Sequence, residues 1–161
     1  MVASTRRPAA DGLSALFDVF VLAQAVHELL ADAFAGAPLT PEEYAVYSQL
    51  LSTPGCTPSE LARYLAAPLT TVSDWVRTLS QRGHVTRKVR LEDRRSYGIV
   101  LTSAGDRVHR ETNRRFEHAN ATFLAALGRS ESELRSVLQD AGAAATAARA
   151  TIASSARESA S

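Results

Sequence analysis

The chain has 161 residues, of which 45% are hydrophobic and 22% charged, and this suits one compact domain rather than two independent ones. Its formal net charge of +1 favours no class of partner, so a nucleic-acid site has to be inferred from where the charges lie. Cys56 is the single cysteine, which excludes an internal disulfide and a thiolate-rich metal site and is typical of a reducing compartment. We find no secretory signal and no apolar run long enough to cross a membrane, so we expect a cytoplasmic protein without a membrane partner.

The N-terminal region is expected to contribute a tail and one long helix. Residues 1–11 are small and polar and are expected to be disordered. From Leu13 to Phe34 the apolar residues follow helical spacing around more than half of the helix circumference. We expect such a helix to be covered on more than one side, and Gly36 to end it.

Two similar start signals predict the next two helices. Thr40-Pro41-Glu42-Glu43 and Thr57-Pro58-Ser59-Glu60 each combine a Thr N-cap, Pro at the first helical position and Glu three residues after the cap. The apolar residues that follow predict helices over about 41–52 and 58–66.

A further helix and a basic hairpin follow the break at Pro68. An apolar stripe from Val72 to Leu79 has helical spacing, and Gly83 is expected to end this helix. Runs with alternating Val and Ile over 84–90 and 96–101 predict two strands joined by the turn LEDRR. From position 77 to position 95 there are seven Arg or Lys residues and two acidic residues, a local charge of +5. A helix followed by a basic two-stranded wing is the outline of a winged helix-turn-helix.

Two long helices are expected after the wing. Ser103 is expected to cap a helix through about Leu127, and Ser130-Glu131-Ser132-Glu133 predicts the start of the last helix. Alanine-rich faces on the last helix permit close packing against other helices. Since the terminal helices have no other core to cover them, we expect two chains to associate through them.

The expected fold is therefore mainly α, a winged helix-turn-helix with a two-stranded wing and a dimerisation region of terminal helices. Residues 37–102 form the winged helix-turn-helix, residues 12–36 and 103–153 form the helical dimerisation region, and residues 154–161 form a flexible C-terminal tail.

The recognition helix and the wing supply the residues expected to bind double-stranded DNA. Short polar side chains at a helix start can reach base edges and phosphates, and Arg77 can form two hydrogen bonds with guanine. Asp74 is expected mainly to pair with an arginine of the chain, because phosphates repel a carboxylate. At the wing tip an arginine can enter a narrow minor groove while Asp93 orients it. The expected DNA-contacting residues are Thr70, Thr71, Ser73, Asp74, Arg77, Arg87, Lys88, Arg94 and Arg95.

The stretch WVRTLSQRGHVTRKVRLEDRRSYGIVLTSAG resembles the MarR family of bacterial winged-helix repressors. The resemblance rests on a recognition helix ending at Gly83, on Arg87, on the DRR of residues 93–95 and on the LTxxG of residues 101–105. It implies a homodimer that represses its own or neighbouring genes from a pseudo-palindromic operator, with Arg95, and secondarily Arg94, in the minor groove. Pro68 departs from the family pattern, in which Ser or Thr caps the recognition helix, and losing such a cap typically costs about 1 kcal/mol.

The resemblance also implies release from DNA by a small-molecule effector, often an aromatic one, that binds between the dimer helices and the winged domain. Ordinary packing is the simpler explanation for each residue that such a cleft would offer. These residues are His27, Tyr44, Tyr47, Arg110 and Arg114.

Two alternatives remain open for the function. The first is an oxidant-sensing repressor acting through Cys56, although the sensing cysteine of such relatives lies near the start of the first helix. The second is a winged helix that docks proteins through Trp75 and the wing, although an arginine-rich wing favours DNA. We find no Ser/His/Asp arrangement, phosphate loop or metal motif, so no catalytic residue, metal site or cofactor is expected.

Overall fold

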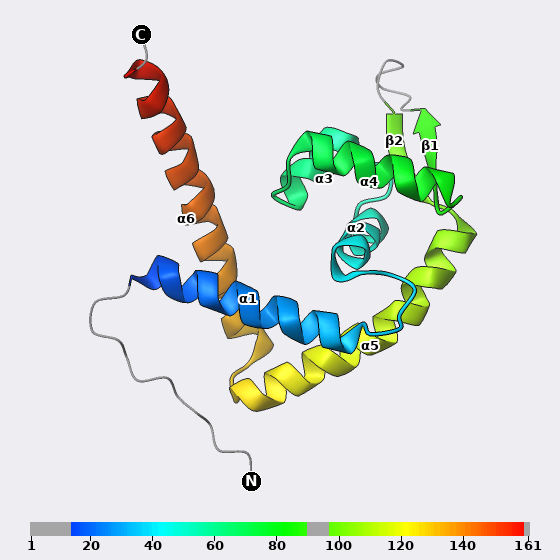
Figure 1. Ribbon diagram of the computed structural model, residues 1–161, viewed down its shortest axis with the longest axis horizontal. Helices are drawn as coiled ribbons and strands as arrows, with labels where there is room; N and C mark the ends of the chain where they lie inside the picture. Colours follow the sequence, from blue (N-terminus) through cyan, green and yellow to red (C-terminus); the bar gives the residue numbers. More distant parts are fainter. Residues whose placement is uncertain (1–13, 90–96, 160–161) are drawn as a thin grey trace. The chain divides into compact units, whose positions relative to one another are not determined.

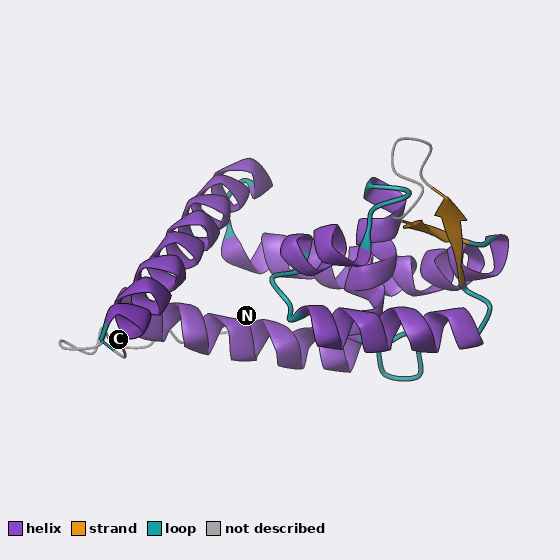
Figure 2. Cartoon of the chain, turned by 90° about the horizontal axis from the view of Figure 1, so that it is seen from above, coloured by secondary structure: helices purple, strands orange, loops and turns teal. Residues whose placement is uncertain are grey.

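The computed structural model describes residues 14–89 and 97–159, which form six helices and one antiparallel hairpin (Figure 1). The elements in chain order are α1 (Ala15–Ala33), α2 (Pro41–Ser52), α3 (Pro58–Tyr64), α4 (Leu69–Gln81), β1 (Val85–Val89), β2 (Tyr97–Leu101), α5 (Ser103–Leu127) and α6 (Glu131–Glu158). Figure 2 shows how far helix dominates the described part of the chain, which confirms the mainly α winged helix-turn-helix. The chain divides after Ala119, within α5, into two compact units.

Capping boxes start α2 and α3, as the sequence predicts. Thr40 Oγ1 accepts from the Glu43 backbone N–H at 3.2 Å, and the Glu43 carboxylate accepts from the Thr40 N–H at 3.2 Å. Thr57 and Glu60 form the same reciprocal pair, with N–H to carboxylate at 2.7 Å. Each box satisfies backbone donors that a helix start leaves without intrahelical acceptors, so both helices begin at a defined residue.

Three boundaries differ from the prediction. Helix α3 ends at Tyr64 rather than near Ala66, because Ala66 has a φ of 50° and so cannot continue a right-handed helix. The cap of α5 is Thr102 and not Ser103: Thr102 Oγ1 accepts from the Gly105 N–H at 3.2 Å. The same hydroxyl donates to the Gly83 carbonyl at 2.7 Å, which ties the start of α5 to the turn after α4. Helix α6 continues to Glu158, past the expected start of the tail at residue 154.

The N-cap of α4 is Pro68, and among the described residues no side chain caps this helix. Its apolar stripe is buried as expected, with Val72, Val76 and Leu79 facing inward. Tertiary packing therefore compensates for the missing cap.

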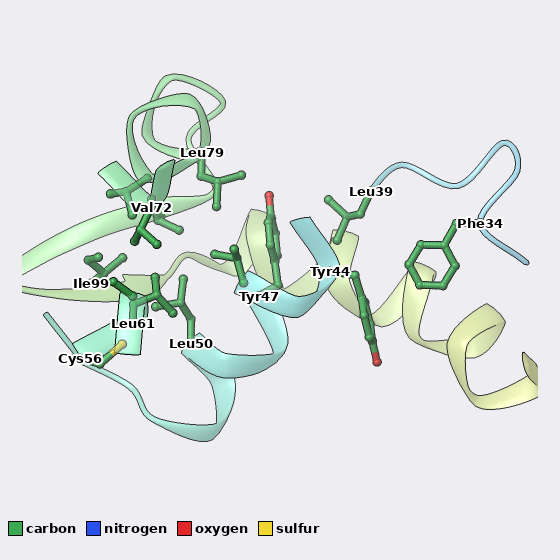
Figure 3. Close-up of a cluster of buried hydrophobic side chains, with 14 residues drawn as sticks. Phe34, Leu39, Tyr44, Tyr47, Leu50, Cys56, Leu61, Val72, Leu79 and Ile99 are labelled. Atoms are coloured by element: carbon green, nitrogen blue, oxygen red, sulfur yellow. The ribbon is translucent and has the colours of Figure 1, made fainter. Parts of the chain in front are cut away.

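The buried core joins α2, α3, α4 and the hairpin, and Figure 3 shows its side chains in one cluster. Leu50, Leu61, Val72, Leu79 and Ile99 are each at most 1% exposed. Since α4 and β2 both contribute to this cluster, the recognition helix and the wing are held against a common core.

The hairpin is also hydrogen-bonded to the turn before α3. The Ile99 N–H donates to the Cys56 carbonyl at 2.9 Å, and the Gly55 N–H donates to the Ile99 carbonyl at 3.0 Å. Gly98 allows this approach, because a Cβ at that position would collide with the Gly55 carbonyl oxygen. The base of the wing is therefore fixed from both sides of β2.

Helices α1 and α6 contain no buried residue. Only the C-terminal end of α1 packs on the core, through Leu30 and Ala33. None of the described helices is long and apolar enough to span a membrane. The exposed large apolar residues of the two helices are Leu16, Phe17, Val19, Phe20 and Leu22 in α1, and Val137, Leu138 and Ile152 in α6.

Candidate nucleic-acid interface

The outer face of α4 is polar and accessible. Thr70, Ser73, Asp74 and Arg77 are exposed, and Thr71 is half-buried. The Ser73 hydroxyl donates to the Leu69 carbonyl at 2.8 Å, so in this position it can serve a base or phosphate only as an acceptor. The predicted recognition residues therefore lie on one face of one helix.

Asp74 and Arg77 form an ion pair on this face, with Oδ1 and Nη2 2.8 Å apart. This confirms that Asp74 has an intramolecular partner. Both side chains are about two thirds exposed, at 64% and 68%, so the pair contributes little to stability. Its effect is on orientation, because the carboxylate restricts the position of the Arg77 guanidinium.

The two basic residues of β1 project to opposite faces of the hairpin. Arg87 pairs with Ile99 and Lys88 with Gly98, and successive side chains of a strand alternate between faces. Arg87 shares its face with Ile99 and Tyr97, and its guanidinium carbon lies 4.4 Å from the Tyr97 ring centroid. Adjacent positions in the sequence thus face different surroundings.

A groove of about 520 Å³ lies between α4 and the hairpin. It brings together three of the predicted DNA-contacting residues of α4 with Arg87, and leaves Lys88 outside. Sequence reasoning missed the contribution of Tyr97, Ser80 and Gln81. The full lining is Pro58, Ser73, Asp74, Val76, Arg77, Ser80, Gln81, Arg87 and Tyr97. The predicted wing-tip residues Asp93, Arg94 and Arg95 lie outside the described residues.

None of the predicted effector residues lines the groove beside the hairpin. His27 Nδ1 lies 3.7 Å from Glu42 Oε1, and Arg110 Nη2 lies 3.0 Å from Asp106 Oδ2. Arg114 is exposed. These polar side chains either meet partners on the surface or face solvent.

Tyr44 is buried in an aromatic and polar cluster between α2 and α5. Its hydroxyl donates to Asn113 Oδ1 at 2.6 Å, and its ring stacks on His109 at 4.9 Å and on Phe116 at 4.8 Å between centroids. Ser48 Oγ lies 3.0 Å from His109 Nε2. Burial raises the pKa of Tyr44 and lowers the pKa of His109, because both charged forms lose solvation. The uncharged forms are therefore favoured at this contact.

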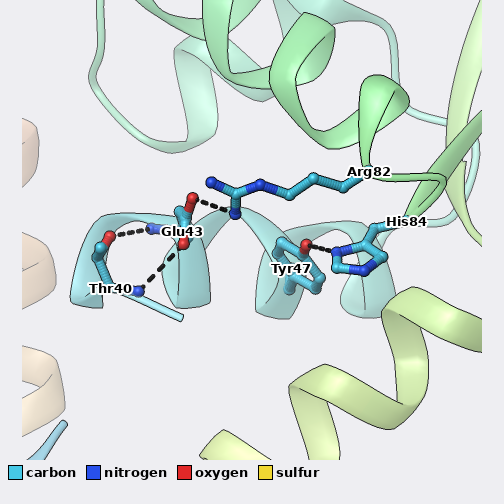
Figure 4. Close-up of polar contacts among 5 residues, drawn as sticks. All are labelled: Thr40, Glu43, Tyr47, Arg82 and His84. Carbon is cyan, nitrogen blue, oxygen red and sulfur yellow. Dashed lines mark hydrogen bonds and ion pairs between the residues drawn. The ribbon is translucent and has the colours of Figure 1, made fainter. Parts of the chain in front are cut away.

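Two polar contacts join α2 to the segment that links α4 with β1 (Figure 4). Arg82 Nη1 donates to Glu43 Oε1 at 2.7 Å, and Tyr47 Oη lies 2.6 Å from His84 Nδ1. Burial raises the pKa of Tyr47 to about 12, so its hydroxyl keeps its proton near neutral pH. We name these two contacts the α2 clamp; they attach α2 to the C-cap of the recognition helix and to the residue before the wing.

A cavity of about 630 Å³ lies beside the α2 clamp. Glu43, Arg82 and His84 form its polar part, and none of the five predicted effector residues lines it. The other lining residues are Ala31, Phe34, Ala37, Pro38, Leu39, Thr40, Pro41 and Val108. The volume is in the range of small-molecule sites.

The residues behind the two alternative functions are at least partly buried. Cys56 is 3% exposed and packs in the core, and burial in apolar surroundings disfavours a reactive thiolate. Trp75 is half-buried and packs against the same core. Neither side chain presents the exposed group that oxidant sensing or docking through Trp75 requires. Over residues 14–89 and 97–159 no cluster of three or more His, Cys, Asp or Glu could hold a metal ion.

The comparisons with known proteins agree with this geometry. The model of the MarR family matches residues 39–97. A Mycobacterium tuberculosis transcriptional regulator, MosR, solved in complex with DNA, superposes with a TM-score of 0.72 and 21% identity, over 85% of this chain and 99% of that one. The Streptomyces coelicolor regulator PcaV, solved with its natural ligand, gives a TM-score of 0.64 and 23% identity, over 84% and 97%.

A probable transcriptional regulator from Pseudomonas aeruginosa is 27% identical, with a TM-score of 0.59 over 78% of this chain and 94% of that one. No curated protein matches the sequence. The MarR family consists of transcription regulators and not of enzymes. The family model thus matches residues 39–97, and the described part of the chain has the fold of the MarR-type transcription regulators.

Proposed function

We propose that the protein is a sequence-specific regulator that binds double-stranded DNA as a homodimer and represses its own or neighbouring genes. The observation that carries the proposal is the accessible face of α4, where Asp74 orients Arg77 and Arg87 lies across the same groove. Arginine and short polar side chains are the groups that read base edges and phosphates. The similarity to MosR, solved in complex with DNA, supports this function.

The homodimer is proposed from the terminal helices. Leu16, Phe20 and Val19 on α1 and Val137 and Ile152 on α6 are between 49% and 74% exposed. A soluble chain rarely leaves so much apolar side chain to water, and a second copy would cover it. Two recognition helices would then enter successive major grooves about 34 Å apart and bind a pseudo-palindromic operator.

The wing is proposed to place an arginine in the minor groove. As the family resemblance implies, Arg95, and secondarily Arg94, would have this role, and Asp93 would hold the arginine in place. We expect Arg95→Ala to weaken operator binding at least about tenfold while the folded dimer persists, because the charge is removed from the groove and not from the core. Unchanged affinity would reject this role of the wing.

The effector site is proposed to be the cavity beside the α2 clamp. A ligand there would contact Arg82, the C-cap of α4, and would compete with the contact that holds it to Glu43. Displacing one end of a recognition helix misaligns the other residues of that helix with the bases. The crystal structure of PcaV with its natural ligand supports a small-molecule effector.

The DNA-binding function is tested by a mobility-shift titration against the DNA upstream of the protein's own coding sequence. Unrelated DNA serves as competitor, and the titration is repeated at two salt concentrations. We expect tight binding that resists the competitor and weakens steeply with salt. Equal, weak binding to both DNAs would contradict sequence-specific regulation from that site.

A further inference from the structure

We propose that Tyr97 is a positioning residue for DNA binding: it holds the Arg87 guanidinium in the groove between α4 and the hairpin, where Arg87 binds one phosphate of the DNA backbone. The inference rests on the proposed DNA-binding function and adds to it a role for a residue outside the predicted contact set. Its basis is the 4.4 Å approach of the Arg87 guanidinium to the Tyr97 ring.

The register of the hairpin places Arg87 and Tyr97 on one face. Arg87 is paired with Ile99, and Tyr97 lies two residues before Ile99 on the same face of β2. Tyr97 is half-buried and packs against the core cluster, whereas Arg87 is exposed. A fixed aromatic ring therefore supports a long side chain that would otherwise sample many rotamers.

The contact with Tyr97 is compatible with a hydrogen-bonding role of Arg87. The guanidinium carbon lies over the Tyr97 ring, and a planar guanidinium over an aromatic ring can still direct N–H groups away from that ring. Such N–H groups match the oxygens of a phosphate. Arg87 can therefore contact Tyr97 and bind a phosphate at the same time.

The place of the groove indicates a backbone phosphate rather than a base. One wall is α4, the helix expected in the major groove, and the other wall is the hairpin that forms the wing. The sugar-phosphate strand that separates the major from the minor groove has to pass between these two elements. Asp74 also lines the groove, but Arg77 pairs with its carboxylate at 2.8 Å and offsets its charge.

Four single variants and two double variants test the role. Tyr97→Phe keeps the ring, Tyr97→Leu removes it but keeps an apolar side chain against the core, and Arg87→Ala removes the guanidinium. Lys88→Ala removes a basic residue on the opposite face of the hairpin and is the control for coupling, because Lys88 does not share a face with Tyr97. Binding to a 30-base-pair duplex of arbitrary sequence is measured by fluorescence anisotropy over a range of NaCl concentrations, since phosphate contacts do not depend on sequence. Melting temperature and circular dichroism identify any variant that is not folded.

We expect Arg87→Ala to reduce the salt slope, d log K against d log[NaCl], by about 1. Tyr97→Leu should weaken binding roughly two- to fivefold and lower the slope toward that of Arg87→Ala, whereas Tyr97→Phe should behave as wild type. The double variant Tyr97→Leu/Arg87→Ala should bind no more weakly than Arg87→Ala alone. Tyr97→Leu should still weaken binding when combined with Lys88→Ala.

Two results would overturn the proposal. If Tyr97→Leu weakens binding by the same factor with and without Arg87, Tyr97 acts only through the structure of the hairpin. If Tyr97→Leu leaves affinity and salt slope unchanged, the ring does not position Arg87. Failure of the DNA-binding function itself is recognised separately, because wild type would then not bind the duplex even at low salt.

Discussion

The segment from α2 to β2 and the terminal helices α1 and α6 differ in how far their apolar side chains are buried within one chain. The first region buries Leu50, Leu61, Leu79 and Ile99 within one chain, at 1% exposure or less. The terminal helices bury no residue, although α1 carries a long apolar stripe. The segment from α2 to β2 is therefore stabilised by contacts within one chain, whereas the apolar residues of the terminal helices would be covered only in the proposed dimer.

The largest effect on stability is expected from a change in the core of the segment from α2 to β2. Leu79→Ala removes a buried side chain of α4 and should lower the free energy of unfolding by about 2 to 5 kcal/mol, because it leaves a cavity in the core. Leu69→Ala, in the same helix but 49% exposed, is the matched control and should cost far less. Chemical denaturation of both variants measures the difference. Equal losses would show that α4 does not pack as described.

A smaller effect is expected from a change in α1, which would weaken the proposed dimer. Phe20 of α1 is 59% exposed, and Phe20→Glu would place a charge in the proposed dimer interface. We expect the dissociation constant of the dimer to rise at least about thirtyfold, or about 2 kcal/mol, while the helix content of the winged region persists. Sedimentation equilibrium measures the constant, and Asp18→Asn, on another side of the same helix, is the control. An unchanged dimer would place the interface elsewhere.

A third change removes one of the two contacts of the α2 clamp. Tyr47→Phe removes the hydroxyl that lies 2.6 Å from His84 Nδ1 and should lower the free energy of unfolding by about 1 kcal/mol. Tyr64→Phe is the matched control because Tyr64 is 46% exposed. If the clamp also holds α4 for DNA, Tyr47→Phe should weaken operator binding by more than the control does. Identical DNA affinity of the two variants would limit the clamp to a structural role.

The smallest effect is expected from pH. The pKa of His109 is lowered by burial from its ordinary value of 6.5, with a smaller opposing effect of Asp106. The unfolded chain therefore binds a proton at higher pH than the folded chain, and stability should fall as the pH drops below about 6.5. The Ser48 hydroxyl and the Tyr44 ring are the other groups facing this imidazole.

His109→Gln should remove part of this pH dependence, measured as the free energy of unfolding between pH 7 and pH 5. His27→Gln, at an exposed position of α1, should leave it in place. If the two variants show the same pH dependence as wild type, His109 is not the group responsible.

Much of the fold could be predicted because its signals are local. The capping boxes at Thr40 and Thr57 define helix starts by contacts within four residues, and Gly83 has the positive φ of 71° that suits a residue after a helix. The cap of α5 was predicted one residue too late because Thr102 and Ser103 both carry hydroxyls. A tertiary contact, from Thr102 to the Gly83 carbonyl, decides between them.

The residues of the candidate DNA-binding site could be predicted only where they lie on one helix. Thr70, Ser73, Asp74 and Arg77 share a face by helical spacing alone. The contact of Arg87 with Tyr97 depends on the register of the hairpin, which spacing within one strand does not determine. Tyr44 and Tyr47 are of a residue type that often binds ligands. Only the three-dimensional structure shows that the hydroxyl of Tyr44 contacts Asn113 and that of Tyr47 contacts His84.

In the proposed function, two copies of the winged helix bind DNA through α4 and the wing. The most direct measurement is selection of duplexes from a random-sequence pool by the wild-type protein, followed by sequencing. We predict enrichment of an inverted repeat whose half-sites are about 10 base pairs apart, centre to centre, as two recognition helices in successive major grooves require. A pool without an enriched sequence, or with a single unrepeated site, would contradict the claim.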